Sequence, residues 1–391
     1  MAPLTDRFRR VTTSGGYMPE IDGLRFIAIM AVVALHVLGY WTVQAGRTYA
    51  RETPLDAALV QVVGLGYHGV HLFFEISGFV LALPFCRAAI LHGPPVSLRN
   101  YCWRRITRLE PPYVISMLVF FAFMPFFKPP PWSALWPHLI ASLCYVHEIV
   151  YGMGSLINNA AWSLEVEIQF YLLMPLIARG LGIPAPWRRA LLAAAAVAFS
   201  LHTLWLPAGW PRSILQYAQF FLVGILLCDV WTTAWRTAPR TWLADVPGVA
   251  SWPLFIWVNT RHAGIAADVA DPWIMALLFY SALRGRGHAA ILAYGAIPII
   301  GGMCYSVYLL HGRPIAFLVH GIFARLPLTG SLATDYAILL AACVPAVLAA
   351  SAIFYLAVER PCMDPAWPRT MAAWLAGRSG IGRRAFARDS S

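Results

Sequence analysis

The sequence predicts an all-α polytopic membrane protein with about ten transmembrane helices in a single bundle. Apolar residues make up 59% of the 391 residues and charged residues only 12%, about half the charged share of a soluble domain. Several apolar runs have about 20 residues, the length needed to cross the hydrocarbon core of a bilayer. The arginines gather in clumps between these runs, as the positive-inside rule expects of cytoplasmic loops.

The arginine clumps set the expected orientation of the spans. In chain order the predicted spans are 22–41, 66–86, 110–127, 163–180, 189–206, 213–231, 247–261, 272–284, 288–310 and 334–357. Clumps precede the first span and follow the second, fourth, sixth, eighth and tenth, so ten spans place every clump and both termini in the cytoplasm. An extra span at 135–152 would move Arg188 and Arg189 outside, so we expect that stretch to be re-entrant or interfacial. The segment 288–323 could hold two short helices.

The chain is expected to form one membrane domain with short polar ends. We find no internal repeat and no long linker, which gives a cytoplasmic segment over 1–20, a membrane domain over 21–361 and a basic cytoplasmic tail over 362–391. No cleavable signal pattern precedes the first span. The loop arginines explain the net charge of +11, so no nucleic-acid partner is expected. The seven cysteines lack CxxC or His/Cys spacing, so no metal site is expected.

Arg25 and His36 lie on the first predicted span and share one face of it. Their separation of eleven positions is three helical turns at close to 3.67 residues per turn, so the two side chains point within about 20° of each other. At about 1.5 Å per residue they stand about 16 Å apart along the axis. Because ionisable groups inside a span usually mark a pathway or a reaction centre, the pair indicates a reagent that enters at one side and reacts toward the other.

Further titratable groups are expected at the membrane depths of Arg25 and His36. Glu167, near the outer end of the fourth span, and His311, at the outer end of the ninth, fall at about the depth of His36. The inner group consists of Asp22, Arg25, Arg105 and Arg108. A contact between Asp22 and Arg25, three residues apart on a helix, lowers the cost of holding the arginine at the membrane edge.

These residue types support transfer of an acyl group to a hydroxyl. His36 could act as general base near neutral pH, with Glu167 orienting the imidazole and stabilising its protonated form. Arg105 and Arg108, three residues apart, could hold one phosphate with two guanidinium groups. A donor with phosphates at one end and a thioester on a long flexible arm would fit this arrangement, with its phosphates at the inner arginines and its thioester at His36. Ser77 is a second-tier candidate, because the nucleophile pattern GxSxG is absent.

Six sequence blocks together resemble the integral membrane acyltransferase family 3. They are DGLR followed by His36, then GVHLFFEISGF, RRITRLEPPY, WSLEVEIQFYLLMP, MCYSVYLLHGRP and the closing Glu359-Arg360-Pro361. They occur in the family's order and spread from about residue 20 to residue 361. The resemblance therefore covers nearly the whole chain.

The resemblance implies an O-acyltransferase that moves an acyl group, usually acetyl from acetyl-CoA, to a hydroxyl of a carbohydrate or small molecule. The family's arginine-to-histidine motif maps onto Arg25 and His36, and its RxxR motif, associated with the CoA donor, onto Arg105 and Arg108. The glutamate of its WSLxxE block maps onto Glu167. Asp22, Ser77 and His311 remain second-tier site residues.

Two departures concern acceptor choice more than the reaction class. His71 stands where the family often has aspartate or asparagine, and Glu75 where an apolar residue is common. Glu110, after the paired arginines, is also unusual. These extra titratable groups could tune the choice of acceptor or could pair with each other.

We expect the protein in the inner membrane of a bacterium. The expected acceptor is a carbohydrate or lipid-linked glycan, and the chain could form a homo-oligomer. Three alternatives stay open at this point. One is acylation of a small molecule of the macrolide type, which other members of the family carry out. Another is a proton-coupled transporter or flippase, which paired broken helices in inverted repeats would favour. A non-catalytic membrane receptor is the third.

Overall fold

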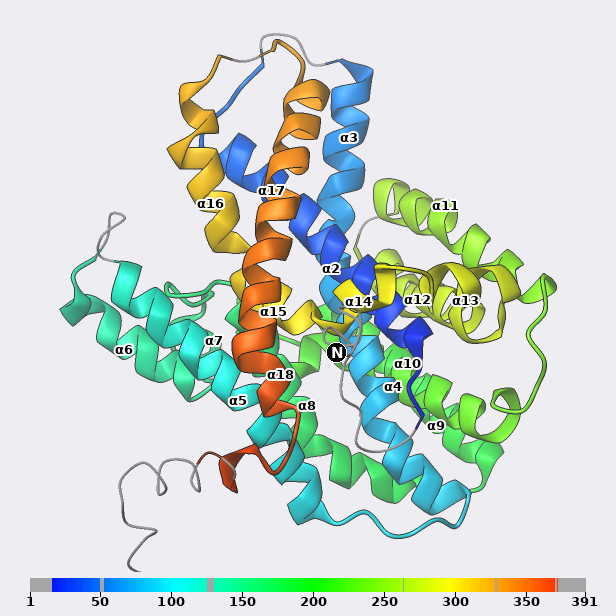
Figure 1. The fold of residues 1–391 in the computed structure, drawn as a ribbon. Coiled ribbons are helices and arrows are strands. Elements are labelled where there is room, and N and C mark those ends of the chain that lie inside the picture. The colour runs from blue at the N-terminus through cyan, green and yellow to red at the C-terminus, as the bar shows by residue number, and fades with distance from the viewer. Residues whose placement is uncertain are drawn as a thin grey trace, which may run out of the picture.

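The computed structural model describes residues 16–49, 53–124, 130–262, 264–327, 329–369 and 371. Within these residues the protein is helical, with no β-strand and a single isolated bridge between Thr241 and Gly285. The predicted all-α class is confirmed. Most of the predicted N-terminal segment and of the basic tail lies outside the described residues (Figure 1).

Seven helical stretches of the described chain are long and apolar enough to cross a membrane. They are α2 with η1 (Pro19–Gly39, Tyr40–Gln44), α3 with η2 and α4 (Pro54–Gly64, Leu65–Tyr67, His68–Ile90), α5 (Leu98–Phe123), α8 with η4 (Ala161–Ile177, Ala178–Gly182), α10 with η6 (Ile214–Val230, Trp231–Trp235), α12 (Ile265–Arg284), and α17 with η9 and α18 (Leu332–Phe354, Tyr355–Glu359, Arg360–Cys362). An eighth exists if α15 (Cys304–Leu310) and the stretch Gly312–Arg325, bent by 43°, form one span. The molecule is therefore a multi-pass helical membrane protein.

The predicted continuous span 288–310 is wrong. Three short helices occupy it: α13 (Arg286–Leu292), α14 (Ile297–Gly302) and α15. Gly295 has a φ of +56°, a conformation that glycine adopts without strain and that ends a helix. The helix resumes only near Pro298, whose ring is tolerated in the first turn. The chain then continues through α16 (Gly312–Gly321) and η8 (Phe323–Arg325), so the apolar helix at this place lies later in the sequence than expected.

Two of the predicted spans form helices shorter than the seven. They are α9 (Ala185–Ser200) and α11 (Val246–Arg261), each of 16 residues. The stretch 135–152, predicted not to span, forms α6 (Trp132–Leu143) and α7 (His147–Tyr151). Tyr145, with a φ of +56°, breaks the helix between them.

Helix α2 runs through the middle of the molecule and packs on α4, which in turn packs on α10 (Figure 1). Close approach of the backbones explains these contacts. A Cβ added to Gly69 would lie 2.3 Å from the Ala28 carbonyl oxygen of α2, and a Cβ added to Gly78 would lie 2.2 Å from the Phe221 carbonyl oxygen of α10. Small residues commonly allow such packing between membrane helices.

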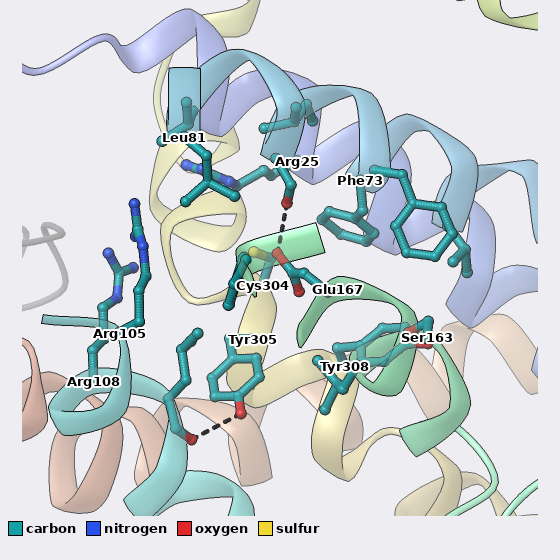
Figure 2. Close-up of a pocket in the computed structure, with 18 of the residues that line it drawn as sticks. Arg25, Phe73, Leu81, Arg105, Arg108, Ser163, Glu167, Cys304, Tyr305 and Tyr308 are labelled. Atoms are coloured by element: carbon teal, nitrogen blue, oxygen red, sulfur yellow. Dashed lines mark hydrogen bonds between the residues drawn. The ribbon is translucent and has the colours of Figure 1, made fainter. Parts of the chain in front are cut away.

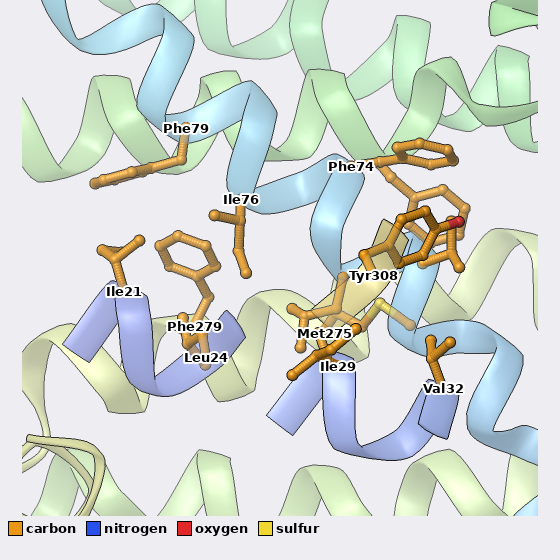
Figure 3. Packing of buried hydrophobic residues seen from close by; sticks show 14 of the residues in the cluster. Ile21, Leu24, Ile29, Val32, Phe74, Ile76, Phe79, Met275, Phe279 and Tyr308 are labelled. Carbon is orange, nitrogen blue, oxygen red and sulfur yellow. The ribbon is translucent and has the colours of Figure 1, made fainter. Parts of the chain in front are cut away.

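The largest buried apolar cluster fills the space around these helices. Figure 3 shows side chains of α2, α4 and α12 interleaving, with Tyr308 of α15 joining them. Leu24, Ile29, Phe79 and Phe279 are fully buried there. This core fixes the faces of α2 and α4 that carry the titratable residues.

Candidate active site

Three predicted arginines meet in one cavity, which we call the arginine pocket. It has a volume of about 120 Å³ and is lined by Arg25, Ser77, Arg105, Arg108, Glu167 and Tyr305, among others. The guanidinium groups of Arg105 and Arg108, both from α5, lie next to each other, with Arg25 of α2 and Glu167 of α8 close by (Figure 2). The pocket thus combines residues from helices that are distant in sequence.

The cations of the arginine pocket are held in different ways. Arg25 is buried and its Nη1 lies 2.5 Å from Asp22 Oδ1, which confirms the contact expected from their spacing. Arg105 stacks between aromatic rings, with its Cζ 5.7 Å from the ring centre of Tyr101 and 5.8 Å from that of Tyr171. Its Nε is buried and donates no hydrogen bond within the described residues. That nitrogen can therefore donate to an anionic ligand.

Glu167 belongs to the arginine pocket. Ser77 Oγ donates a hydrogen bond of 2.6 Å to Glu167 Oε1, so the second-tier residue Ser77 is part of the same pocket. The expected contact between Glu167 and His36 is not formed: within the described chain, His36 bonds to other groups. The reason is that a serine on α4 faces this carboxylate, whereas His36 lies in a different cavity.

His36 lines a second and larger cavity, which we call the histidine cavity. Its volume is about 510 Å³, and its lining includes His36, His68, Trp162, Tyr217, Asp268 and Asp271. These residues come from five helices: α2, α4, α8, α10 and α12. The lining mixes aromatic rings with hydrogen-bonding groups, as small-molecule sites usually do.

Hydrogen bonds fix which nitrogen of His36 is unprotonated. His36 Nδ1 lies 2.9 Å from the Val32 carbonyl oxygen and 3.1 Å from His311 Nε2, while His311 Nδ1 lies 2.8 Å from the Tyr308 carbonyl oxygen. Because a carbonyl oxygen only accepts, each Nδ1 must carry the proton. His311 Nε2 then accepts from His36, which leaves His36 Nε2 with a free lone pair. This nitrogen makes no hydrogen bond in the described part of the protein.

The two cavities adjoin each other at Tyr308 and Val70, which line both. The Tyr308 hydroxyl lies 2.6 Å from Ser163 Oγ and donates to the Ala160 carbonyl oxygen at 3.0 Å. These contacts hold the ring in place between the cavities. An elongated substrate could therefore reach from the arginines toward His36.

Sequence reasoning missed several residues of the histidine cavity. Tyr308 precedes His311 by one helical turn in the block YSVYLLH, so the sequence alone predicts that the two side chains lie close together. The contact of His68 Nδ1 with Asp271 Oδ2, at 3.3 Å, joins α4 to α12. No local sequence pattern predicts a contact between two residues that lie so far apart in the chain. No group of three or more His, Cys, Asp or Glu residues that could hold a metal occurs in the described residues.

Comparison with known proteins decides the class of this protein. Residues 18–356 match the family described as acyltransferase domain, the acyltransferase family 3. The chain belongs to this family. Together with the relatives below, this makes the protein a membrane acyltransferase that needs an acyl donor and an acceptor.

The relatives share its class at low identity. Acyltransferase MdmB of Streptomyces mycarofaciens is 26% identical over 381 residues, which cover 88% of this chain and 92% of that protein. Peptidoglycan O-acetyltransferase OatA of Listeria monocytogenes is 29% identical over 178 residues, 43% of this chain and 25% of that protein. O-acetyltransferase OatA of Staphylococcus aureus is 27% identical over 184 residues, 44% of this chain and 27% of that protein. The match therefore spans about a quarter of each OatA. No solved structure matches the chain.

Proposed function

We propose that the protein transfers an acyl group, acetyl in the first place, from acyl-CoA to a hydroxyl of a carbohydrate acceptor. The observation that carries the proposal is the pair of adjoining cavities, one with arginines and one with a histidine base. The acetyl group is supported by the OatA relatives, which are named O-acetyltransferases. The cavities give each substrate a chemically suitable place.

The arginine pocket is the proposed site of the CoA phosphates. Arg105 and Arg108 present their guanidinium groups side by side (Figure 2), and such forks match phosphate oxygens. The buried Nε of Arg105 supplies a further donor. Arg25, paired with Asp22, adds positive potential deeper in the pocket. The flexible arm of the donor then passes Tyr308 and carries the thioester toward His36.

His36 is the proposed general base. Its Nε2 takes the proton from the acceptor hydroxyl while the oxygen attacks the thioester carbonyl carbon. The carbon–sulfur bond breaks, and the thiolate takes the proton back from the imidazolium, giving the ester and free CoA. No other co-reactant is needed. General acid–base catalysis of this kind contributes about 10²- to 10⁴-fold to the rate.

His311 takes the positioning role that the sequence had given to Glu167. By accepting from His36 Nδ1 at 3.1 Å, it holds the tautomer in which Nε2 is the base, and the bond strengthens when His36 becomes positively charged. Glu167, bonded to Ser77, is proposed to shape the passage between the arginines and Tyr308.

The histidine cavity is the proposed acceptor site. Trp162 and Tyr217 lie with ring centres 5.4 Å apart, and Arg212 stands over Trp162 at 4.9 Å. Aromatic faces can cover the apolar face of a sugar ring, while Asn159, Gln216 and Asp268 offer hydrogen bonds to its hydroxyls. The carbohydrate class is also supported by a relative that is named a peptidoglycan O-acetyltransferase.

For the membrane arrangement we propose ten spans with both termini in the cytoplasm of a bacterial cell and the chain in the inner membrane. The seven long helices, the bent pair of α15 and α16, and the shorter α9 and α11 add up to ten. The arginine pocket then faces the cytoplasm, where acyl-CoA is available, and the histidine cavity faces outward.

The test is acyl transfer by purified protein with radiolabelled acetyl-CoA and a panel of membrane glycans. Wild type, His36→Ala and Arg105→Ala/Arg108→Ala are compared. We expect label on a glycan with wild type alone. Transfer by His36→Ala at the wild-type rate would remove the base role, and unchanged acetyl-CoA affinity in the double variant would remove the phosphate role.

A further inference from the structure

An apolar groove lies beside the histidine cavity. It has a volume of about 160 Å³, and its lining includes Ala28 and Ala31 of α2, Gly69 of α4, Trp252 and Phe255 of α11, and Met275 of α12. At its edge, Val62 and Trp252 are each 46% exposed. In a membrane protein, such an edge between helices faces lipid. We refer to this feature as the apolar groove.

Small residues create the apolar groove. Gly66 and Gly69 bring α4 onto the backbone of α2, because a Cβ at either position would lie within 2.4 Å of a carbonyl oxygen of α2. Ala28 and Ala31, one turn apart on α2, add only methyl groups to the floor. The larger side chains of α11 and α12 form the opposite wall. The space left between the walls suits a narrow chain.

The apolar groove is continuous with the acceptor side and not with the donor side. His68 lines both the groove and the histidine cavity, whereas the groove and the arginine pocket have no lining residue in common. On α2, Ala31 of the groove precedes His36 by five residues, or about 7.5 Å along the axis. A ligand that occupies the groove therefore enters the histidine cavity at His68, and its polar end can lie in the cavity that His36 lines.

The junction itself carries an unpartnered polar atom. His68 is 5% exposed, and its Nε2 is buried without a hydrogen bond in the described residues. Its Nδ1 lies 3.3 Å from Asp271 Oδ2 and 3.0 Å from His71 Nδ1, so this side of the ring is already held. A buried polar atom without a partner is costly, and a sugar hydroxyl, which can either donate or accept, would satisfy it.

We infer that the acceptor is a membrane-borne glycolipid, with its sugar in the histidine cavity and its apolar chain in the apolar groove. The inference rests on the proposed function and narrows its acceptor class. The chain anchors the acceptor laterally from the bilayer and sets the sugar hydroxyl next to His36. A long acyl chain on the donor would also end near His36; suppression of the groove labelling by palmitoyl-CoA and not by dodecyl glucoside would assign the groove to that chain and overturn the inference.

The test is photo-crosslinking of the full chain in detergent with dodecyl β-D-glucoside that carries a diazirine on its last carbon. We expect adducts on the peptides of α2, α11 and α12 that line the groove. Excess plain dodecyl glucoside should suppress them, and excess dodecanol should not. Equal labelling by a dodecanol probe, without competition by the glucoside, would mean an ordinary lipid-chain site and would overturn the inference. Adducts confined to other helices would overturn it as well.

Groove-filling variants sharpen this test. Ala31→Phe and Ile256→Trp place bulk in the groove, and excluding two or more methylenes should lower labelling by about tenfold or more. Ala250→Phe is the matched control, because Ala250 is an exposed residue of α11 outside the groove lining. In the transfer assay, the two groove variants should raise KM for dodecyl glucoside and leave that for methyl glucoside unchanged. Full labelling of both groove variants would contradict the inference.

His36→Ala separates this inference from the proposed function. Because crosslinking needs no turnover, the variant should keep the groove adducts while it loses acyl transfer. Groove adducts together with unimpaired transfer by His36→Ala would overturn the catalytic account alone. Impaired transfer by that variant without groove adducts in wild type would overturn the glycolipid inference alone.

Discussion

At the scale of single residues, the proposed mechanism depends on which nitrogen of His36 is free. The Val32 carbonyl oxygen fixes the proton on His36 Nδ1, and the Tyr308 carbonyl oxygen fixes the proton on His311 Nδ1. His311 Nε2 is therefore unprotonated and accepts a hydrogen bond from His36 Nδ1. In this pair, the His311 imidazole would orient the proposed base, a role that a carboxylate has in many catalytic dyads. In the proposed mechanism, the positive charge that forms on His36 is stabilised by His311 and not by a carboxylate.

His311 can be tested apart from His36. His311→Leu removes the acceptor for His36 Nδ1–H, so kcat should fall about tenfold to a hundredfold, the worth of one such hydrogen bond. KM for acetyl-CoA should stay unchanged, because the arginine pocket is untouched. His311→Gln keeps an acceptor oxygen and should recover part of the rate. The measurement is steady-state transfer together with its pH profile; an unchanged kcat and profile in His311→Leu would refute the positioning role.

Arg105 offers a second test at this scale. Arg105→Ala should raise KM for acetyl-CoA about tenfold to a hundredfold, as expected for a lost charged hydrogen bond, with kcat changed much less. Salt should weaken donor binding in wild type more than in the variant. Arg104→Ala is the matched control, since the neighbouring Arg104 does not line the pocket. Equal effects of the two variants would contradict a specific phosphate contact.

Residue types and helical spacing predicted part of the site. They gave the Asp22–Arg25 contact and gathered Arg105 and Arg108 into one region, because these pairs lie within single helices. The partners of His36 and Glu167 could not be predicted, because His311 and Ser77 lie on other helices. Which of two carboxylates or histidines meets a given side chain depends on helix rotation, which the packing of α2 on α4 decides.

At the scale of helices, close glycine contacts set the relative position of the walls of both cavities. Gly78 of α4 and Gly224 of α10 each face a carbonyl oxygen of the other helix. Helix α4 carries Ser77 of the arginine pocket and His68 of the histidine cavity. A shift of α4 would therefore disturb the proposed donor and acceptor sites together.

Gly78→Ala should destabilise the fold. The new Cβ would lie 2.2 Å from the Phe221 carbonyl oxygen, so the helices must separate, at a cost of about 1–3 kcal/mol. Gly39→Ala is the control, because nothing lies within 4 Å of that Cβ and the backbone is helical with a φ of −63°. Thermal unfolding in detergent, followed by tryptophan fluorescence, should show a lower midpoint for the first variant only. Equal midpoints would argue against close packing at this site.

Apolar run length predicted most of the long helices, since α2, α4, α5, α8, α10 and α17 all lie where runs of about 20 apolar residues were predicted. Helix α12 begins seven residues before its predicted run 272–284. Run length failed over 288–310, where the run is apolar but Gly295 ends the helix. Hydropathy does not register one residue with positive φ. The consequence reaches the site, because His311 lies at the bend between α15 and α16 and not at the end of a straight span.

At the scale of the whole molecule, the proposed roles of the two cavities give acyl transfer a direction. The arginine pocket lies toward the N-terminal end of α2 and the histidine cavity toward its C-terminal end, where Arg25 and His36 line them. With the N-terminus in the cytoplasm, as proposed, the acyl group would enter from one side of the membrane and the acceptor would be modified from the other. The protein would then carry an acyl group across the bilayer without carrying CoA.

The most direct measurement of this account is the sidedness of transfer in sealed vesicles that contain the protein in one known orientation. Radiolabelled acetyl-CoA is supplied on the side of Arg105 or on the opposite side, and esterified sugar is then measured on each face. We predict transfer only with acetyl-CoA on the side of Arg105, and ester only on the opposite face. Equal transfer with acetyl-CoA on either side, or ester on the same face as the donor, would contradict the account.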